Sequence, residues 1–265
     1  QTQSHQNEIS SISNKQSLVF LIMKNHGYGL TLFLLLGILM LLHIAVGDGP
    51  LYNICSDSAT FAANGTYDSN LTKLLGYLSK KAPLSGFATY STGKAPNQAY
   101  GLALCRGDVS SANCGTCLRE ASQEIRNRCS NNEGAMIWYD YCFLRYSEYD
   151  LFGQIDEGSK FYMWNVNLVN NPSTFNAETE KILTRLSTVA VKSPKLYAAG
   201  QAKLSKSTDL YGLVQCSRDL TGDKCQVCLR GIIGELPKCC NGTEGGRVVS
   251  ASCNFRYEIY PFVFS

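Results

Sequence analysis

The 265-residue chain is long enough for one large domain or for two domains of about 100 to 150 residues. Its 45% hydrophobic and 17% charged residues are typical of a globular protein. The formal net charge of +3 is too small to indicate a nucleic-acid or anionic-membrane partner. The twelve cysteines are the unusual feature, and all of them lie between Cys55 and Cys253.

The N-terminal segment predicts secretion. Lys24 precedes an apolar run over residues 30–46, and small residues follow up to Gly47. This pattern is typical of a signal peptide, here residues 23–47, and the run is short for a membrane span. Residues 1–22 precede Met23 and are interpreted as a translated upstream segment. We therefore expect a secreted, extracellular mature chain with no membrane span, in a compartment where disulfides persist.

The cysteines reveal an internal repeat. Five of them recur at an offset of 111 residues: Cys105, Cys114, Cys117, Cys129 and Cys142 become Cys216, Cys225, Cys228, Cys240 and Cys253. A Tyr-Gly-Leu motif before them and an Arg-Tyr motif after them recur at the same offset. The chain is therefore a tandem duplication. We predict a first domain over residues 48–150, a linker over 151–160 and a second domain over 161–265.

Each copy carries the signals of two helices followed by strands. The apolar residues with helical spacing are Leu71, Leu74, Leu75 and Leu78 in the first copy, and Ile182, Leu183 and Leu186 in the second. A further helix is predicted over residues 114–125 and again over 225–236, where Asp223 would be the N-cap. Alternating apolar residues predict strands within 135–146 and 247–264. The predicted fold class is α+β, with two tandem domains, each an antiparallel sheet packed against two helices and stapled by disulfides.

The residue types argue against an enzyme. His5, His26 and His43 all precede the predicted cleavage site, which excludes histidine-dependent catalysis and histidine-containing metal sites in the mature chain. The Cys-x2-Cys spacing is also found in zinc sites, but a secreted chain favours disulfides. No two acids can be placed at the separation of glycosidase carboxylates. We predict no enzyme activity, no metal and no cofactor.

The duplicated Cys-x8-Cys-x2-Cys motif, with Tyr-Gly-Leu before it and Cys-Asn-x-Arg-Tyr after it, resembles the plant stress-antifungal domain. This ginkbilobin-type module occurs in cysteine-rich repeat secretory proteins and in receptor-like kinases, and the resemblance covers residues 51–264. It implies the disulfides Cys55–Cys129, Cys105–Cys114, Cys117–Cys142, Cys216–Cys225 and Cys228–Cys253.

Two cysteines of the second copy stand outside this scheme. At the 111-residue offset, Val166 takes the place of Cys55, so Cys240 has lost the expected partner. The adjacent Cys239 has no counterpart in the first copy. A vicinal disulfide between Cys239 and Cys240, two free thiols and intermolecular pairing all remain open.

The resemblance also implies a carbohydrate site in the second copy. Ginkbilobin-like domains bind mannose through an asparagine after the first cysteine, an arginine seven residues past the fifth and a glutamate five past the sixth. The second copy has Asn167, Arg247 and Glu258 at these places. The first copy has Ser56, Met136 and Ser147 there. A carboxylate, a guanidinium and an amide supply the acceptors and donors that sugar hydroxyls need.

Structural interpretations compete with this one. Glu258 could pair with Arg256 on one strand face, and Tyr162 and Trp164 could stack on a sugar but are expected to pack in the core. Asn64, Asn70 and Asn241 lie in N-glycosylation sequons, which indicate secretion and surface exposure.

Two functions follow from the resemblance. The first is a plant defence lectin in the apoplast that binds mannose-containing glycans, such as those of fungal surfaces. The second is an extracellular interaction module that binds a cell-surface protein and no carbohydrate.

Overall fold

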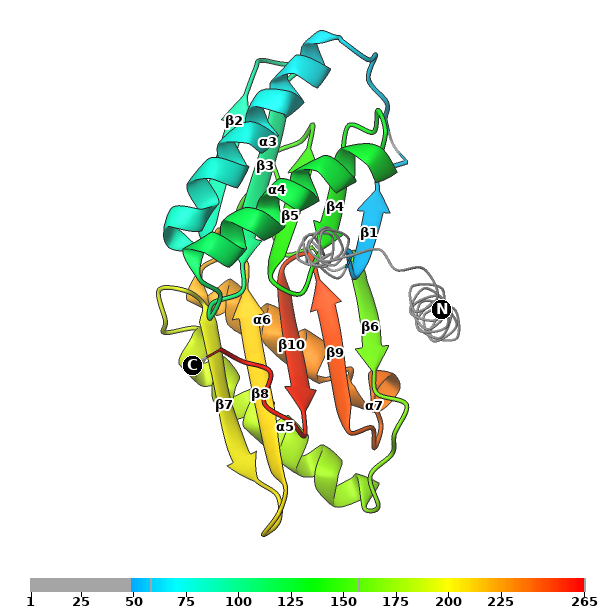
Figure 1. The fold of residues 1–265 in the computed structure, drawn as a ribbon, viewed down its shortest axis with the longest axis vertical. Coiled ribbons are helices and arrows are strands. Elements are labelled where there is room, and N and C mark those ends of the chain that lie inside the picture. Colours follow the sequence, from blue (N-terminus) through cyan, green and yellow to red (C-terminus); the bar gives the residue numbers. More distant parts are fainter. Residues whose placement is uncertain (1–48, 58, 157, 265) are drawn as a thin grey trace, which may run out of the picture. The chain divides into compact units, whose positions relative to one another are not determined.

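The computed structural model describes residues 49–57, 59–156 and 158–264. The predicted upstream segment and signal peptide therefore lie outside the described residues. The two copies form two five-stranded antiparallel sheets of the same topology, each covered on one face by helices (Figure 1). This agrees with the predicted α+β class.

The first copy builds its sheet in the order β1-β4-β5-β3-β2. Its elements are β1 (Tyr52–Cys55), α3 (Thr66–Ser85), β2 (Phe87–Thr92), β3 (Ala99–Cys105), α4 (Ser111–Arg128), β4 (Ala135–Trp138) and β5 (Cys142–Ser147). Helix α3 ends because Gly86 adopts the left-handed conformation (φ 81°) that favours glycine. Helix α4 begins earlier than predicted, since the Ser110 side chain caps it by accepting a hydrogen bond from the Asn113 amide.

The second copy repeats this sheet in the order β6-β9-β10-β8-β7. Its elements are β6 (Lys160–Trp164), α5 (Pro172–Ala190), β7 (Tyr197–Lys203), β8 (Asp209–Cys216), α6 (Gly222–Ile233), α7 (Leu236–Cys239), β9 (Gly245–Ser250) and β10 (Cys253–Glu258). The N-cap of α6 is Thr221 rather than Asp223, because the Thr221 hydroxyl accepts from the Lys224 amide.

Disulfides join helices to strands in both copies. The five pairs implied by the family resemblance are all present. Cys239 and Cys240 form a vicinal disulfide, one of the three alternatives that the sequence left open. The first strand of the first copy is therefore tied to α4 through Cys55–Cys129, whereas β6 has no such tie.

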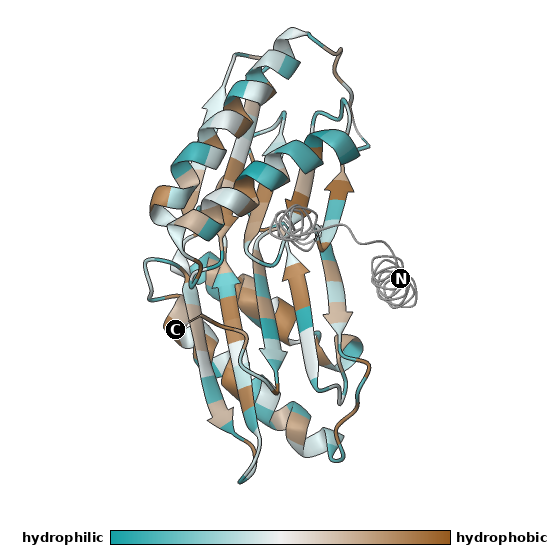
Figure 2. Ribbon diagram, viewed as in Figure 1, coloured by the Kyte–Doolittle hydropathy of each residue, from teal (hydrophilic) through white to brown (hydrophobic). Residues whose placement is uncertain are grey.

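Three apolar clusters hold the described chain together. One lies between the helices and the sheet of each copy. The third joins the copies and contains Leu102, Leu104, Met136, Trp138, Phe143, Leu151, Phe161, Val249 and Ala251. Figure 2 shows apolar and polar residues alternating along the strands, as expected when each face meets different surroundings. Within the described residues, no helix is both long and apolar enough to cross a bilayer.

Candidate functional site

A pocket of about 180 Å³ opens on the helix-free face of the second sheet. Val248 of β9 is buried beneath the helices, so strand alternation turns the neighbouring Arg247 to the opposite face. The same alternation turns Arg256 and Glu258 of β10 to that face, beside Arg247. The pocket is also lined by Met163, Asn165 and Tyr260.

Glu258 is the fixed acceptor of the pocket. Its side chain is only 8% exposed, and Arg256 Nε donates to its Oε1 atom at 2.9 Å. Gly245 lies directly across the strand pair, where a Cβ atom would collide with the carboxylate. Glycine at this position thus lets the carboxylate lie against the backbone. The predicted pairing of Glu258 with Arg256 is present, and it orients the carboxylate within the pocket.

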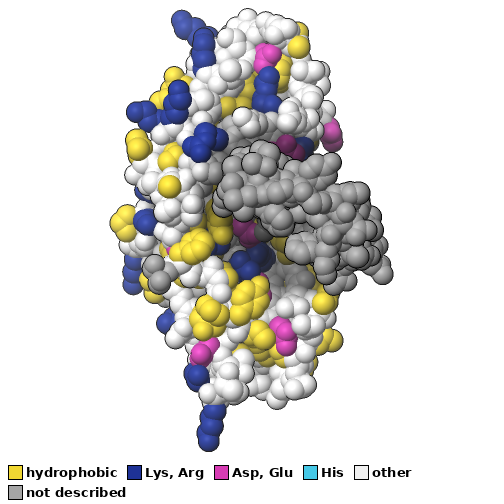
Figure 3. Space-filling view, in the orientation of Figure 1, with side chains coloured by type: hydrophobic (Ala, Val, Ile, Leu, Met, Phe, Trp, Pro, Cys, Tyr) yellow, Lys and Arg dark blue, Asp and Glu magenta, His cyan; other side chains and the backbone are white. Residues whose placement is uncertain are grey.

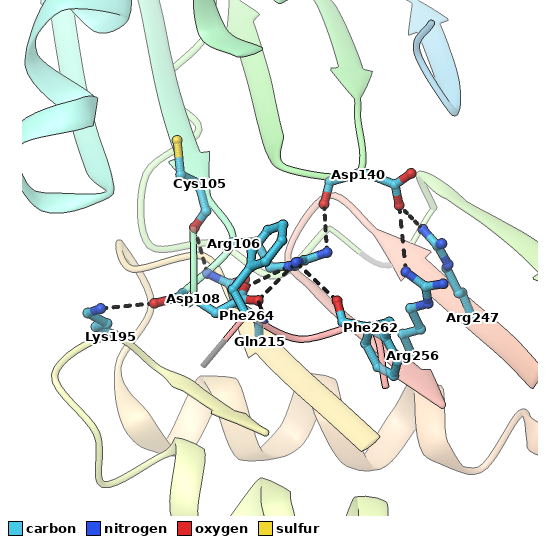
Figure 4. A network of polar contacts seen from close by, with 11 residues as sticks. Cys105, Arg106, Asp108, Asp140, Lys195, Gln215, Arg247, Arg256, Phe262 and Phe264 are labelled. Atoms are coloured by element: carbon cyan, nitrogen blue, oxygen red, sulfur yellow. Dashed lines mark hydrogen bonds and ion pairs between the residues drawn. The ribbon is translucent and has the colours of Figure 1, made fainter. Parts of the chain in front are cut away.

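Arg247 is held from the other copy. Its Nη1 atom donates at 2.5 Å to Oδ1 of Asp140, which lies in the turn between β4 and β5 of the first copy. Arg256 Nη1 lies 3.9 Å from the same oxygen, and its guanidinium stacks over the Phe262 ring at 4.2 Å. Figure 4 shows the two arginines converging on Asp140. Residues of both repeats therefore form the cationic side of the pocket. The sequence pattern did not predict that Asp140 contributes to it.

The amide of the pocket comes from Asn165 rather than Asn167. In the first copy Cys55 is paired with Ala135, and the backbone N–H of Ser56 donates to the Gly134 carbonyl. At the equivalent places in the second copy, Trp164 is paired with Gly246, and the backbone N–H of Asn165 donates to the Gly245 carbonyl. Trp164 is thus the counterpart of Cys55, 109 residues away, and Asn165 is the counterpart of Ser56. Asn167 is exposed and lies outside the pocket lining.

The first copy has a similar hollow with different chemistry. A pocket of about 220 Å³ is lined there by Ser56, Met136 and Ser147, at the places of Asn165, Arg247 and Glu258. Arg145, the counterpart of Arg256, pairs instead with Asp156 at 2.9 Å. Only the second copy combines a carboxylate, an amide and two guanidinium groups in this pocket.

Two aromatic residues lie differently from the prediction. Tyr162 and Trp164 were expected in the core, but they are 37% and 58% exposed. Both point to the helix side of the edge strand β6, where the Tyr162 hydroxyl bonds to Glu235. The prediction was wrong because β6 is the edge strand of its sheet, with a neighbouring strand on one side only. Trp164 and Tyr260 are both among the residues that line the pocket, and Tyr260 is 47% exposed.

The vicinal disulfide supports the floor of the pocket from behind. Cys239 Sγ lies 3.6 Å from the Arg247 carbonyl oxygen, and Cys240 Sγ lies 3.9 Å from the Met163 carbonyl oxygen. Burial raises the pKa of Tyr257 to about 12, so its hydroxyl stays protonated and donates to the Cys240 carbonyl. The backbone beneath Arg247 is thereby fixed from the helix side.

A family model described as salt stress response/antifungal matches residues 54–149 and 164–260. The chain belongs to this family. An antimicrobial ginkbilobin-2-like protein of Castanea crenata is 52% identical over 231 residues, covering 87% of this chain and 95% of that protein. Cysteine-rich repeat secretory protein 38 of Arabidopsis thaliana is also 52% identical, over 80% of this chain and 85% of that protein.

The fold is shared with solved members of the salt stress response/antifungal family. The tandem DUF26 ectodomain of the Arabidopsis thaliana receptor-like protein PDLP8 superposes with a TM-score of 0.71 at 24% identity, covering 80% of this chain and 98% of that structure. The ectodomain of PDLP5 gives 0.67 at 25% identity. These relatives place the chain among secreted, disulfide-rich repeat proteins.

The three sequons of this family member differ in exposure. Asn64 and Asn241 are exposed, and glycosylation there stays a prediction. Asn70 is buried, and its Nδ2 atom donates to the Asn97 carbonyl at 2.8 Å. The prediction for Asn70 conflicts with this burial, because a glycan would have to be attached to the amide nitrogen that makes this bond.

Among the described residues, no group of three or more His, Cys, Asp or Glu side chains is placed to hold a metal ion.

Proposed function

We propose that this secreted protein is a plant defence lectin that binds mannose-containing glycans, including those of fungal surfaces, through the pocket of its second repeat. The observation that carries the proposal is the fixed Glu258 carboxylate beside Arg247 and Asn165 in an open pocket. Sugar hydroxyls both donate and accept, so a carboxylate with guanidinium and amide groups matches them. Tyr260 offers an apolar ring for the C–H face of the sugar.

The binding of mannose tests this proposal. Glu258→Gln is expected to weaken mannose binding about tenfold or more, since a hydrogen bond to a charged group contributes about 1.5–3 kcal/mol and each 1.4 kcal/mol is tenfold. Asn165→Ala removes a neutral partner that contributes about 0.5–1.5 kcal/mol, so it is expected to weaken binding by up to about tenfold. Titration calorimetry and a mannan-coated surface measure the affinity. The glutamine retains an oxygen for Arg256, so thermal unfolding should change little.

Asn167→Ala is the matched control. Asn167 is exposed and outside the pocket, so its substitution should leave the affinity unchanged. If Asn167→Ala weakens binding and Asn165→Ala does not, the assignment of the amide is wrong. If neither Glu258→Gln nor Asn165→Ala alters mannose binding, the pocket is not the mannose site.

A second candidate is an interaction module for a cell-surface protein. Apolar side chains are exposed along and beyond the edge strand β6, with Trp164, Val166 and Leu168 at 58%, 84% and 68%. Such an edge can add a strand from a partner. A Trp164→Ser/Leu168→Ser variant that loses a defined protein partner while a glycan array shows no signal for the wild type would favour this candidate.

A further inference from the structure

A groove of about 220 Å³ runs between the two repeats, away from the pocket of Glu258. One wall is the end of α3, at Pro83 and Leu84, together with Val109 after β3. The other wall comes from the second repeat, at Lys195 and Arg218. The groove therefore exists only because the two copies are packed together.

The groove carries positive charge with no countercharge among its lining residues. Lys195 Nζ donates to the Gly107 carbonyl at 2.9 Å, and Arg218 Nη1 donates to the Ser85 carbonyl at 2.6 Å. Neither side chain takes part in any of the ion pairs found among the described residues. Each has used one donor on a neutral carbonyl and keeps the others for a ligand. Arg106, the third cation of the lining, is neutralised by Asp108 at 2.7 Å.

The positive charge continues along the rim. Lys80 and Lys81 are exposed one turn before Pro83 on α3. Arg119 of α4 is exposed, and its guanidinium lies close to Pro83, because both flank Gly115. A Cβ atom built on Gly115 would lie 3.4 Å from Arg119 Nη1 and 3.5 Å from Pro83. Figure 3 shows Lys and Arg side chains gathered along the edge of the molecule over α3 and the junction of the repeats. A ligand that lies across this rim would meet several cations in a row.

The walls of the groove narrow the class of ligand. Leu84 is 76% exposed, and with Pro83 and Val109 it offers an apolar surface next to the cations. No aromatic residue is among the described residues that line the groove, and the nearby Phe87 ring already lies under the Arg218 guanidinium at 5.5 Å, so nucleobases would find no free ring to stack on. A uronic acid combines an apolar C–H face with a carboxylate, which matches an aliphatic wall beside Lys195 and Arg218.

We propose that the groove between the repeats binds a polyuronate, an acidic polysaccharide with one carboxylate on each sugar. The groove is smaller than the roughly 300–1,000 Å³ of a cleft that encloses a drug-sized ligand, so it holds one or two sugar residues while the rest of the chain follows the rim. This site is separate from the proposed mannose pocket, and neither depends on the other.

The probe is an oligomer of α-1,4-linked galacturonic acid, titrated into the full secreted chain at low and at physiological salt. We expect binding that weakens as salt rises, because screening reduces attraction between exposed charges. The fully methyl-esterified oligomer has the same backbone without charge and should not bind. An excess of mannose should not displace the acidic oligomer.

Lys195→Gln/Arg218→Gln is the test variant, because glutamine keeps an N–H donor for the carbonyls and removes both charges. We expect about tenfold weaker binding or more, since each charge-assisted bond to a carboxylate is lost. Lys181→Gln/Lys203→Gln is the matched control with the same change in net charge. Both of its lysines are exposed and already paired, with Glu178 and Asp209.

Four outcomes would overturn the proposal: no binding by the wild-type chain, equal binding of the esterified oligomer, displacement by mannose, or the same loss in the control variant as in the groove variant. The last would mean attraction to net charge alone. Thermal unfolding of both double variants checks that the junction between the repeats is intact. A single Arg218→Lys variant keeps the positive charge and should therefore retain most of the binding to the acidic oligomer.

Discussion

Replacing Trp138 with alanine is expected to lower the free energy of unfolding by about 3–5 kcal/mol, the usual loss for a buried Trp or Phe. Trp138 belongs to the first repeat and is 3% exposed, but its ring contacts Phe161 of the second repeat with centroids 5.4 Å apart. Its Nε1 atom lies 3.4 Å from the Ser250 carbonyl oxygen. The truncation therefore removes contacts that join the two copies. Urea unfolding followed by far-UV circular dichroism, with the disulfides intact, measures the loss.

Tyr149→Ala is the control for this prediction. Tyr149 is 70% exposed, so its substitution should change stability by no more than about 0.5 kcal/mol. A loss below about 1 kcal/mol for Trp138→Ala would contradict the view that the third apolar cluster joins the repeats.

The two disulfides that involve the equivalent cysteines Cys129 and Cys240 are expected to differ strongly in their effect on stability. Cys55–Cys129 closes a loop with a sequence separation of 74, so chain entropy predicts that Cys55→Ala/Cys129→Ala lowers stability by about 4 kcal/mol. Cys239–Cys240 links neighbours, for which the same relation predicts about 1 kcal/mol. Urea unfolding of the two double variants tests the difference.

The same pair of variants separates stability from binding. The Cys239→Ala/Cys240→Ala variant removes two sulfur atoms that lie behind the Arg247 and Met163 carbonyls, so any change in mannose affinity would come from the floor of the pocket. Equal losses of stability in both double variants would show that loop closure does not explain how the first repeat is stabilised.

Much of the fold could be predicted because the signals are local. The Cys-x8-Cys-x2-Cys spacing recurs around α4 and α6, and the helical spacing of Leu71, Leu74 and Leu78 marks the buried face of α3. Caps were less predictable, since Thr221 and Asp223 are both good N-cap residues and only the backbone decides between them.

The amide of the candidate site was misplaced because the offset between the copies is not constant. It is 111 residues from β3 onward, but Trp164 follows Cys55 by 109. Loops change length at little cost in free energy, so an offset measured at the cysteines of α4 does not extend across the preceding loops. With Cys55 replaced in the second copy, no residue type marked the correct position.

Asp140 could not be predicted from the sequence for a different reason. It lies 107 residues from Arg247, in a turn of the other repeat, and no periodicity relates the two. Contacts between repeats depend on how the sheets pack, which is set by the cluster around Trp138 and Phe161. The residue types of the pocket were visible in the sequence, but the partner that orients Arg247 was not.

The pairing of Asp140 with Arg247 has a consequence for how such tandem chains evolve. A repeat exchanged with that of a paralogue would bring its own residue to the turn between β4 and β5, and a residue without a carboxylate there would leave the guanidinium of Arg247 without its anion. The two halves are therefore expected to be inherited as a matched pair, and recombination between gene copies should be tolerated at the ends of the tandem unit more readily than at its middle.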